Sequence, residues 1–131
     1  MNKVVFVVIV FVISSGVANA AREWAFQGVY VKDVSVYNYN NYNMVTVQIE
    51  GDVNWNTGCA PTDVHHIVSY RNNSVSSSMQ TWVSMLLFAQ AQDLPVNLWV
   101  DMNNCMSGSQ WDVFGAPAGL GLHLYGVRIA E

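Results

Sequence analysis

The chain has 131 residues, of which 52% are hydrophobic and only 11% are charged, and its formal net charge is −4. This length fits one domain and leaves little room for a second. The hydrophobic content excludes a disordered chain. The acidic balance argues against a nucleic-acid-binding protein, which needs a basic face to neutralise phosphates.

The first twenty residues have the pattern of a secretory signal peptide. Lys3 gives a positive start, an unbroken apolar run follows from Val4 to Ile13, and the small residues Ala18-Asn19-Ala20 match a cleavage site. A membrane anchor is the alternative, but ten apolar residues are too few to cross about 30 Å of hydrocarbon. We therefore expect cleavage after Ala20. It would leave residues 21–131 as one exported domain, secreted or periplasmic, with a net charge of −5 once Lys3 is lost.

Two cysteines, Cys59 and Cys105, lie in the predicted mature chain. In an oxidising compartment the natural prediction is one disulfide between them. Closing that loop would stabilise the fold by roughly 4 kcal/mol, which matters because a domain of this size buries a small core. Two unrelated free thiols are the alternative. A metal site is disfavoured because neither cysteine has another Cys or His at ligand spacing, and we expect no metal and no other cofactor.

Alternating apolar residues predict strands along most of the mature chain. From Gly28 to Tyr37 the alternation slips by one position at Lys32-Asp33, so we expect a strand with a β-bulge there. The segment from Met44 to Glu50 alternates most clearly. The remaining predicted elements are strands at Val64–Tyr70, Val96–Asp101 and Leu120–Ile129, a helix at Ser78–Gln92 that ends before Pro95, and a long loop at 102–119.

The predicted fold class is mainly β with one helix, in the order β-β-β-α-β-β. This order favours an OB-fold, a five-stranded Greek-key barrel, whose common form carries a helix between the third and fourth strands. The bulged first strand also suits a barrel, because a strand shared between two halves of a sheet must bend. A small open sandwich is the structural alternative.

The segment from Tyr37 to Asn43 joins the first two predicted strands and consists only of Tyr and Asn. Tyr rings stack on sugar faces, Asn side chains donate and accept hydrogen bonds, and OB-folds often bind oligosaccharides with this loop. The alternative is a hairpin loop chosen only for its turn propensity. The candidate ligand-binding residues of this segment are Tyr37, Tyr39, Asn40, Asn41 and Tyr42.

The densest titratable cluster contains Asp63, His65 and His66. Asp63 and His65 would share a strand face, but no third ligand is evident, so structural or surface histidines are favoured over a metal site. His123, in the last predicted strand, is expected to be a barrel histidine with its hydrogen bonds satisfied. No serine lies in a Gly-x-Ser-x-Gly elbow, and we expect no enzymatic activity.

Three tryptophans, Trp55, Trp99 and Trp111, lie in or near predicted loops and strand faces. Each is a candidate ligand platform or interface anchor, with ordinary packing as the more common alternative. Asn72-Asn73-Ser74 matches a glycosylation sequon, which is meaningful only in a eukaryotic secretory host.

Several short segments of the mature chain match one known pattern in their order and spacing. They are Glu23-Trp24, Phe26-Gln27-Gly28-Val29, Gln48-Ile49-Glu50-Gly51, Asn73-Ser74-Val75, Pro95-Val96-Asn97-Leu98-Trp99 and Leu120-Gly121-Leu122. Together they resemble the B subunits of AB5 toxins of the subtilase cytotoxin and typhoid toxin type, over most of the mature chain.

That resemblance implies a secreted OB-fold subunit that assembles into a ring of five and binds sialylated glycans on host cells. The sugar-contacting Ser of the family's Phe-Ser-Gly-Val segment corresponds to Gln27, so the resemblance makes Gln27 a ligand-binding position. The chain departs from the family at Phe88-Ala89-Gln90, which keeps one ring of a Tyr-Phe-Tyr-like run. It also has Gln48 in place of a Cys, so the disulfide pairing must differ.

The predicted helix is apolar most of the way round. One stripe, formed by Met79, Trp82, Val83 and Leu86, would pack on the barrel, whereas Met85, Leu87 and Phe88 fall largely outside it. In the resembling family the helices face one another around a central channel. We therefore expect a homo-oligomer, with a pentamer favoured and Met85, Leu87 and Phe88 at the interface. The alternative is that the loop at 102–119 folds over the helix within one chain.

The favoured interpretation is a secreted glycan-binding subunit that forms a homo-oligomeric ring and accompanies a separate toxic A subunit. Its expected partner is a cell-surface glycan, with sialylated glycans as the leading class, and no nucleic acid or membrane span is expected. The alternative is a stand-alone exported OB-fold protein that binds a protein or an envelope component and has no toxin role. A small secreted hydrolase is the third interpretation.

Overall fold

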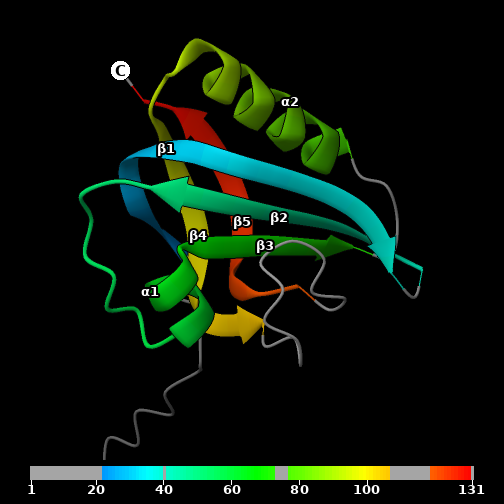
Figure 1. The fold of residues 1–131 in the computed structure, drawn as a ribbon. Helices are drawn as coiled ribbons and strands as arrows, with labels where there is room; N and C mark the ends of the chain where they lie inside the picture. The colour runs from blue at the N-terminus through cyan, green and yellow to red at the C-terminus, as the bar shows by residue number, and fades with distance from the viewer. Residues whose placement is uncertain (1–21, 40, 73–76, 107–118, 131) are drawn as a thin grey trace, which may run out of the picture.

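Five strands and two helices make up the described part of the chain (Figure 1). The computed structural model describes residues 22–39, 41–72, 77–106 and 119–130. The predicted signal peptide, Asn40, Trp111 and the last two sequon residues therefore lie outside the described residues. The elements are β1 (Arg22–Tyr39), β2 (Tyr42–Glu50), α1 (Ala60–His65), β3 (Ile67–Asn72), α2 (Ser77–Gln92), β4 (Val96–Met106) and β5 (Gly121–Ile129).

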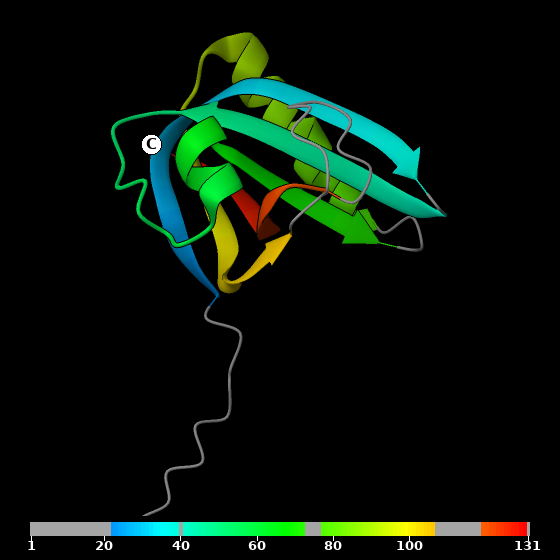
Figure 2. The ribbon, with the colours of Figure 1, turned by 60° about the horizontal axis from the view of Figure 1, so that its bottom comes forward.

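The five strands close into a barrel in the order β1-β2-β3-β5-β4 (Figure 2). β1 serves two neighbours, because its first part, Arg22 to Val29, pairs with β4 and its second part, Tyr30 to Tyr39, pairs with β2. β3 and β5 pair in parallel, and the other four pairings are antiparallel. β1 has three irregularities in its pairing, which let one strand bend around the barrel.

The predicted bulge at Lys32-Asp33 is confirmed. Val31 pairs with Ile49 and Asp33 pairs with Gln48, which leaves Lys32 as the extra residue. The slip in the hydrophobic alternation therefore has the expected cause, since one inserted residue moves the following side chains to the opposite face.

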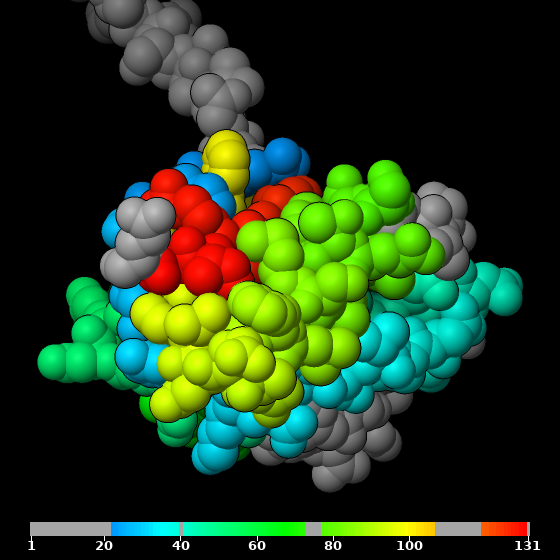
Figure 3. Space-filling model, turned by 90° about the horizontal axis from the view of Figure 1, so that it is seen from above, coloured from blue at the N-terminus to red at the C-terminus, as the bar shows by residue number. Residues whose placement is uncertain are grey.

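Aliphatic side chains from all five strands fill the barrel, and α2 covers one end of it (Figures 1 and 3). α2 buries Met79, Leu86 and Ala89, while Trp82 and Val83 are partly buried against the same core. Each large apolar side chain buried in this way contributes about 1.5–3 kcal/mol. The predicted apolar stripe of the helix thus faces the barrel.

The predicted strand from Val64 to Tyr70 is wrong in its first part. Ala60–His65 form the short helix α1, and β3 begins at Ile67. Pro61 stands in the first turn of α1, where its missing N–H costs no hydrogen bond, and His66 ends the helix in the left-handed conformation with φ 59°. The single predicted helix and the order β-β-β-α-β-β are therefore wrong, and the order is β-β-α-β-α-β-β.

Three strands are longer than predicted, β2 by the two residues Tyr42 and Asn43 and the other two by more. β1 begins at Arg22 instead of Gly28, because bulges in its first part obscure the alternation. β4 extends to Met106, so the predicted loop at 102–119 is wrong over 102–106, and residues 107–118 lie outside the described residues. The alternation of apolar residues does not predict this extension, because it contains the polar residues Asn103 and Asn104. Cys105 nevertheless pairs with Leu122 of β5.

The predicted disulfide between Cys59 and Cys105 is confirmed, with the two Cα atoms 5.6 Å apart. It joins the residue before α1 to the end of β4. Disulfides of this kind are typical of proteins in oxidising compartments. Neither helix in the described ranges is long and apolar enough to cross a membrane.

Candidate functional site

A bulge in β1 opens a cleft between β1 and β4. Phe26 pairs with Leu98 and Val29 pairs with Val96, so two residues of β1 face the single residue Asn97. These two residues are Gln27 and Gly28. The bulge is possible because Gly28 adopts φ 68°, a conformation that side chains rarely tolerate.

The side chain of Asn97 fills the gap that the bulge leaves in the ladder. Its Oδ1 accepts a hydrogen bond of 2.9 Å from the Gly28 N–H, and the residue is only 7% exposed. A cavity of about 560 Å³ opens beside this contact. Its lining residues are Gln27, Gly28, Asn97, Arg128, Ile129 and Ala130, which together we call the cleft.

The cleft presents oriented polar groups. Because Asn97 Oδ1 is used by Gly28, its Nδ2 is oriented as a donor, and Arg128 is its partner on β5. Gln27 Nε2 donates to the Trp24 carbonyl at 3.0 Å, which orients Gln27 Oε1 as an acceptor. A guanidinium and an amide donor beside one acceptor suit a ligand with a carboxylate and hydroxyl groups.

An aromatic surface adjoins the cleft. The rings of Trp24 and Trp99 lie 5.4 Å apart at 43°, and we call this pair the tryptophan platform. Arg128 lies over the Trp24 ring at 4.8 Å, and Trp99 is 39% exposed. Gly126 lies beneath the platform, where an added Cβ would stand 3.3 Å from Trp99 Cβ and 4.0 Å from the Trp24 ring.

Each of the three arginines in the described ranges lies over an aromatic ring. Besides Arg128, Arg22 lies 3.7 Å from the Tyr125 ring centre and Arg71 lies 5.2 Å from that of Tyr42. A stacked guanidinium keeps its charge and the N–H groups along its edge, so it remains able to bind an anion.

Most of the Tyr/Asn segment belongs to the two strands that it was predicted to join, and the turn between them is tight. β1 continues to Tyr39, β2 begins at Tyr42, these two residues pair directly, and Asn41 has φ 64°. Both tyrosines are exposed, whereas Tyr37 is partly buried and its hydroxyl lies 3.5 Å from Thr46 Oγ1. Two-residue hairpin turns favour Asn at positive φ, which explains Asn41 without a ligand.

The hairpin and Gln27 lie at opposite ends of β1. Tyr39 follows Gln27 by twelve residues, roughly 40 Å of fully extended strand before curvature is counted. Figures 1 and 2 show the hairpin on the side of the barrel opposite to the end of β5, which lines the cleft. The structure therefore does not bring these two predicted site regions together, and one sugar cannot touch both.

The titratable side chains at 63–66 make contacts that stabilise the local structure. Asp63 and His65 lie on α1, so the prediction that they share a strand face is wrong. The Asp63 carboxylate accepts hydrogen bonds from the N–H and hydroxyl of Thr57, and the His66 ring stacks on Trp55 at 3.8 Å. Among the described residues no group of three His, Cys, Asp or Glu side chains is placed to hold a metal ion.

His123 departs from the expectation that its hydrogen bonds are satisfied. Its Nδ1 accepts from Asn104 Nδ2 at 3.0 Å, but its Nε2 is buried without a partner among the described residues. Burial lowers the pKa of His123, and the nearby charges of Arg71 and Arg22 lower it further against the opposing effect of Asp101.

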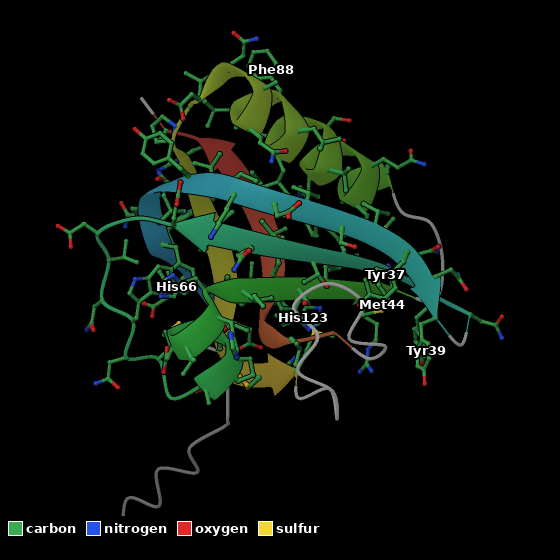
Figure 4. The ribbon with its side chains drawn as sticks, in the orientation of Figure 1. Tyr37, Tyr39, Met44, His66, Phe88 and His123 are labelled. Atoms are coloured by element: carbon green, nitrogen blue, oxygen red, sulfur yellow. A yellow bond between two sulfur atoms is a disulfide. The ribbon has the colours of Figure 1, made fainter. Side chains whose placement is uncertain are left out.

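Of the three predicted interface residues, Leu87 and Phe88 are exposed on α2, whereas Met85 packs partly against the core. Leu87 is 49% exposed and Phe88 is 55% exposed, while Met85 is half-buried. Figure 4 shows Phe88 on the side of α2 away from the barrel. Met85 and Phe88 also line a shallow hollow of about 450 Å³ that extends from α2 to Ile129 of β5, an element that lies beside α2 in Figure 3.

Sequence reasoning located Gln27 and Trp99 but missed Asn97 and Arg128 as site residues. A signal for Asn97 is present, because one polar residue interrupts the apolar run of β4. The spacing of Phe26 and Val29 also indicates a second bulge, since two buried residues three positions apart cannot share one face of a regular strand. No comparable feature of the sequence indicates Arg128 as a site residue.

A scan against protein-family models finds no match for this chain, and a comparison with curated proteins finds none either. The proposed function therefore depends on the geometry of the cleft and on the sequence segments described above.

Proposed function

We propose that this chain is an exported glycan-binding subunit that holds the terminal sugar of a glycan in the cleft. The observation that supports this most directly is the fixed set of polar groups at the bulge of β1, where Asn97, Arg128 and Gln27 meet beside the tryptophan platform. Small-molecule sites commonly combine a hollow, a few oriented polar groups and aromatic surface.

The favoured ligand class is a sugar that carries a carboxylate. Arg128 provides a cation that sugar hydroxyls alone do not require, and Asn97 Nδ2 adds a second donor. Sialylated glycans belong to this class, and Gln27 occupies the position of a sugar-contacting residue in the toxin B subunits that the sequence resembles. Uronic acids share the same chemistry, so both are suitable probes.

We further propose that the barrel is an OB-fold and that the chain assembles as a homo-oligomeric ring, with five copies favoured. The strand order β1-β2-β3-β5-β4 and the helix between β3 and β4 support the fold assignment. The exposed side chains of Leu87 and Phe88 support a second covered face on α2. A separate toxic A subunit remains part of this proposal, as does the absence of enzymatic activity.

Binding of glycans to cleft variants tests the proposed function. We expect Arg128→Gln to weaken binding of a carboxylated glycan by about tenfold or more, because one charge-assisted hydrogen bond is lost. Arg71→Gln is the matched control, since it removes the same charge and the same stacking on a ring at the hairpin end of the barrel. Equal binding by the wild type and Arg128→Gln would reject the cleft, and a selective loss in Arg71→Gln would move the site to the hairpin.

The alternative function, a stand-alone binder of a protein or envelope component, is favoured by one observation. Neighbouring Trp and Arg side chains, here Trp24, Trp99 and Arg128, are also typical of protein-interface hot spots. A monomeric mass together with no bound glycan on an array would favour this alternative.

A further inference from the structure

We propose that the tryptophan platform is a second subsite, which binds the next sugar of a glycan whose terminal sugar occupies the cleft. This inference rests on the proposed function, because it extends the ligand of the same site. It predicts that the protein binds an oligosaccharide and not only its terminal residue.

Two lining residues of the cleft contact the tryptophan platform, so the two surfaces adjoin. Arg128 lines the cleft and also lies over the Trp24 ring at 4.8 Å. Gln27, another lining residue, donates a hydrogen bond to the Trp24 carbonyl at 3.0 Å. The Trp24 ring that Arg128 covers lies 5.4 Å from the Trp99 ring between centres, so both rings are near the edge of the cleft.

Neighbouring residues order the two rings of the tryptophan platform. Gly126 is the pairing partner of Trp99 across β4 and β5, and its missing side chain leaves room for the Trp99 side chain to lie against the β5 backbone. The Trp24 ring contacts both Trp99 and Arg128, and these contacts restrict its motion. Rings that are already ordered lose little conformational entropy when a ligand stacks on them.

The exposure of Trp99 indicates the class of ligand. An indole that is 39% exposed at the edge of a polar cleft offers an apolar face beside hydrogen-bonding groups. A pyranose ring has the matching structure, because its C–H face stacks on an aromatic ring while its hydroxyls reach the solvent. The occupant we assign is therefore a sugar ring linked to the carboxylated sugar in the cleft.

The test compares one terminal sugar with the oligosaccharide that contains it. The probes are N-acetylneuraminic acid with the trisaccharide sialyllactose, and glucuronic acid with a trisaccharide that it terminates, each titrated into the mature protein. For at least one pair, the trisaccharide should bind more tightly than its terminal sugar. Trp99→Ala should reduce that trisaccharide's affinity by about tenfold and leave the affinity of the terminal sugar unchanged.

Three further variants make the result specific. Trp99→Tyr should restore most of the trisaccharide affinity, and Gly126→Ala should reduce it, because the added Cβ displaces Trp99. Tyr39→Ala, which removes an exposed ring at the hairpin, should change neither affinity.

Two outcomes overturn the subsite and are distinguishable from each other. If Trp99→Ala leaves both affinities unchanged or lowers both equally, the platform is not a separate subsite, while the cleft and the proposed function stand. If neither trisaccharide binds the wild-type protein, the proposed function fails and the subsite fails with it.

Discussion

The fold holds His123 in its neutral form. Asn104 Nδ2 can only donate, so Nδ1 of His123 is the acceptor and the ring proton is on the buried Nε2. Charged groups face the ring from three strands: Arg22 from β1, Arg71 from β3 and Asp101 from β4. Burial and the two arginines outweigh Asp101, so the pKa of His123 is lower in the folded state than in the unfolded chain.

This lowered pKa predicts a loss of stability in acid. Well above pH 6.5, the ordinary pKa of His, His123 is neutral in both states and contributes no pH dependence. As the pH falls from there toward the folded-state pKa, His123 becomes protonated in the unfolded chain but stays neutral in the folded protein. The free energy of unfolding should therefore decrease. Denaturant unfolding of the wild type and His123→Gln between pH 8 and pH 5 measures this.

His65 and His66 are present in both proteins, so a comparison of wild type with the His123→Gln variant isolates the contribution of His123. The stability difference between wild type and variant should therefore shrink as the pH is lowered. A difference that is constant across the range would contradict the lowered pKa.

Single residues set the limit of what the sequence predicts about the site. Gln27 was found through a resemblance and Trp99 through its chemistry, but Asn97 is a site residue only because a bulge turns Gly28 N–H toward it. This contact joins positions 69 residues apart. Local patterns can indicate the polar interruption in β4 and the irregular spacing in β1, but they do not show that the two meet.

At the scale of elements, regular patterns were predictive and short or irregular segments were not. The bulge at Lys32 was predicted because the phase of a long alternating strand changes there. α1 was missed because one and a half turns are too few for a helical period, and Val64 and Ile67 then read as part of a strand. The end of β4 was missed because its pairing depends on β5 and the disulfide and not on its own apolar residues.

The outer face of α2 makes a prediction about assembly. Met85→Asp combined with Phe88→Asp should convert a ring of about five copies into folded monomers, because the charges cannot be buried between helices. Light scattering measures the mass, and circular dichroism confirms that the variant remains folded. The matched control is Val36→Asp with Val64→Asp, which places the same charges on exposed apolar residues outside α2.

A wild-type protein that is strictly monomeric at micromolar concentration would reject the ring. A mass that falls equally in the control pair would instead assign the interface to a surface other than α2.

At the scale of the whole molecule, the disulfide joins β4, which carries cleft residues, to the residue before α1. β4 carries Asn97 and Trp99 near its start and Cys105 near its end. Replacing both cysteines by serine should cost about 2–5 kcal/mol of unfolding free energy, because the unfolded chain is no longer constrained. Thermal and denaturant melts measure this cost, and a free-thiol assay on the unreduced, denatured wild type should read near zero.

Two reactive thiols in that assay, or a double variant as stable as the wild type, would contradict a structural disulfide. Glycan affinity of the double variant below its melting temperature should stay close to that of the wild type, since neither cysteine lines the cleft.

The central claim is that a carboxylated glycan binds in the cleft at the bulge of β1, and NMR chemical-shift mapping on the isotope-labelled mature protein tests it most directly. On titration with sialyllactose or a glucuronic-acid-terminated trisaccharide, we expect the largest shifts at the Gly28 amide, the Asn97 side-chain amide and the Arg128 guanidinium. The signals of Asn41 to Asn43 in the hairpin should remain unchanged. Shifts confined to the hairpin, or no shifts with either glycan, would contradict the account.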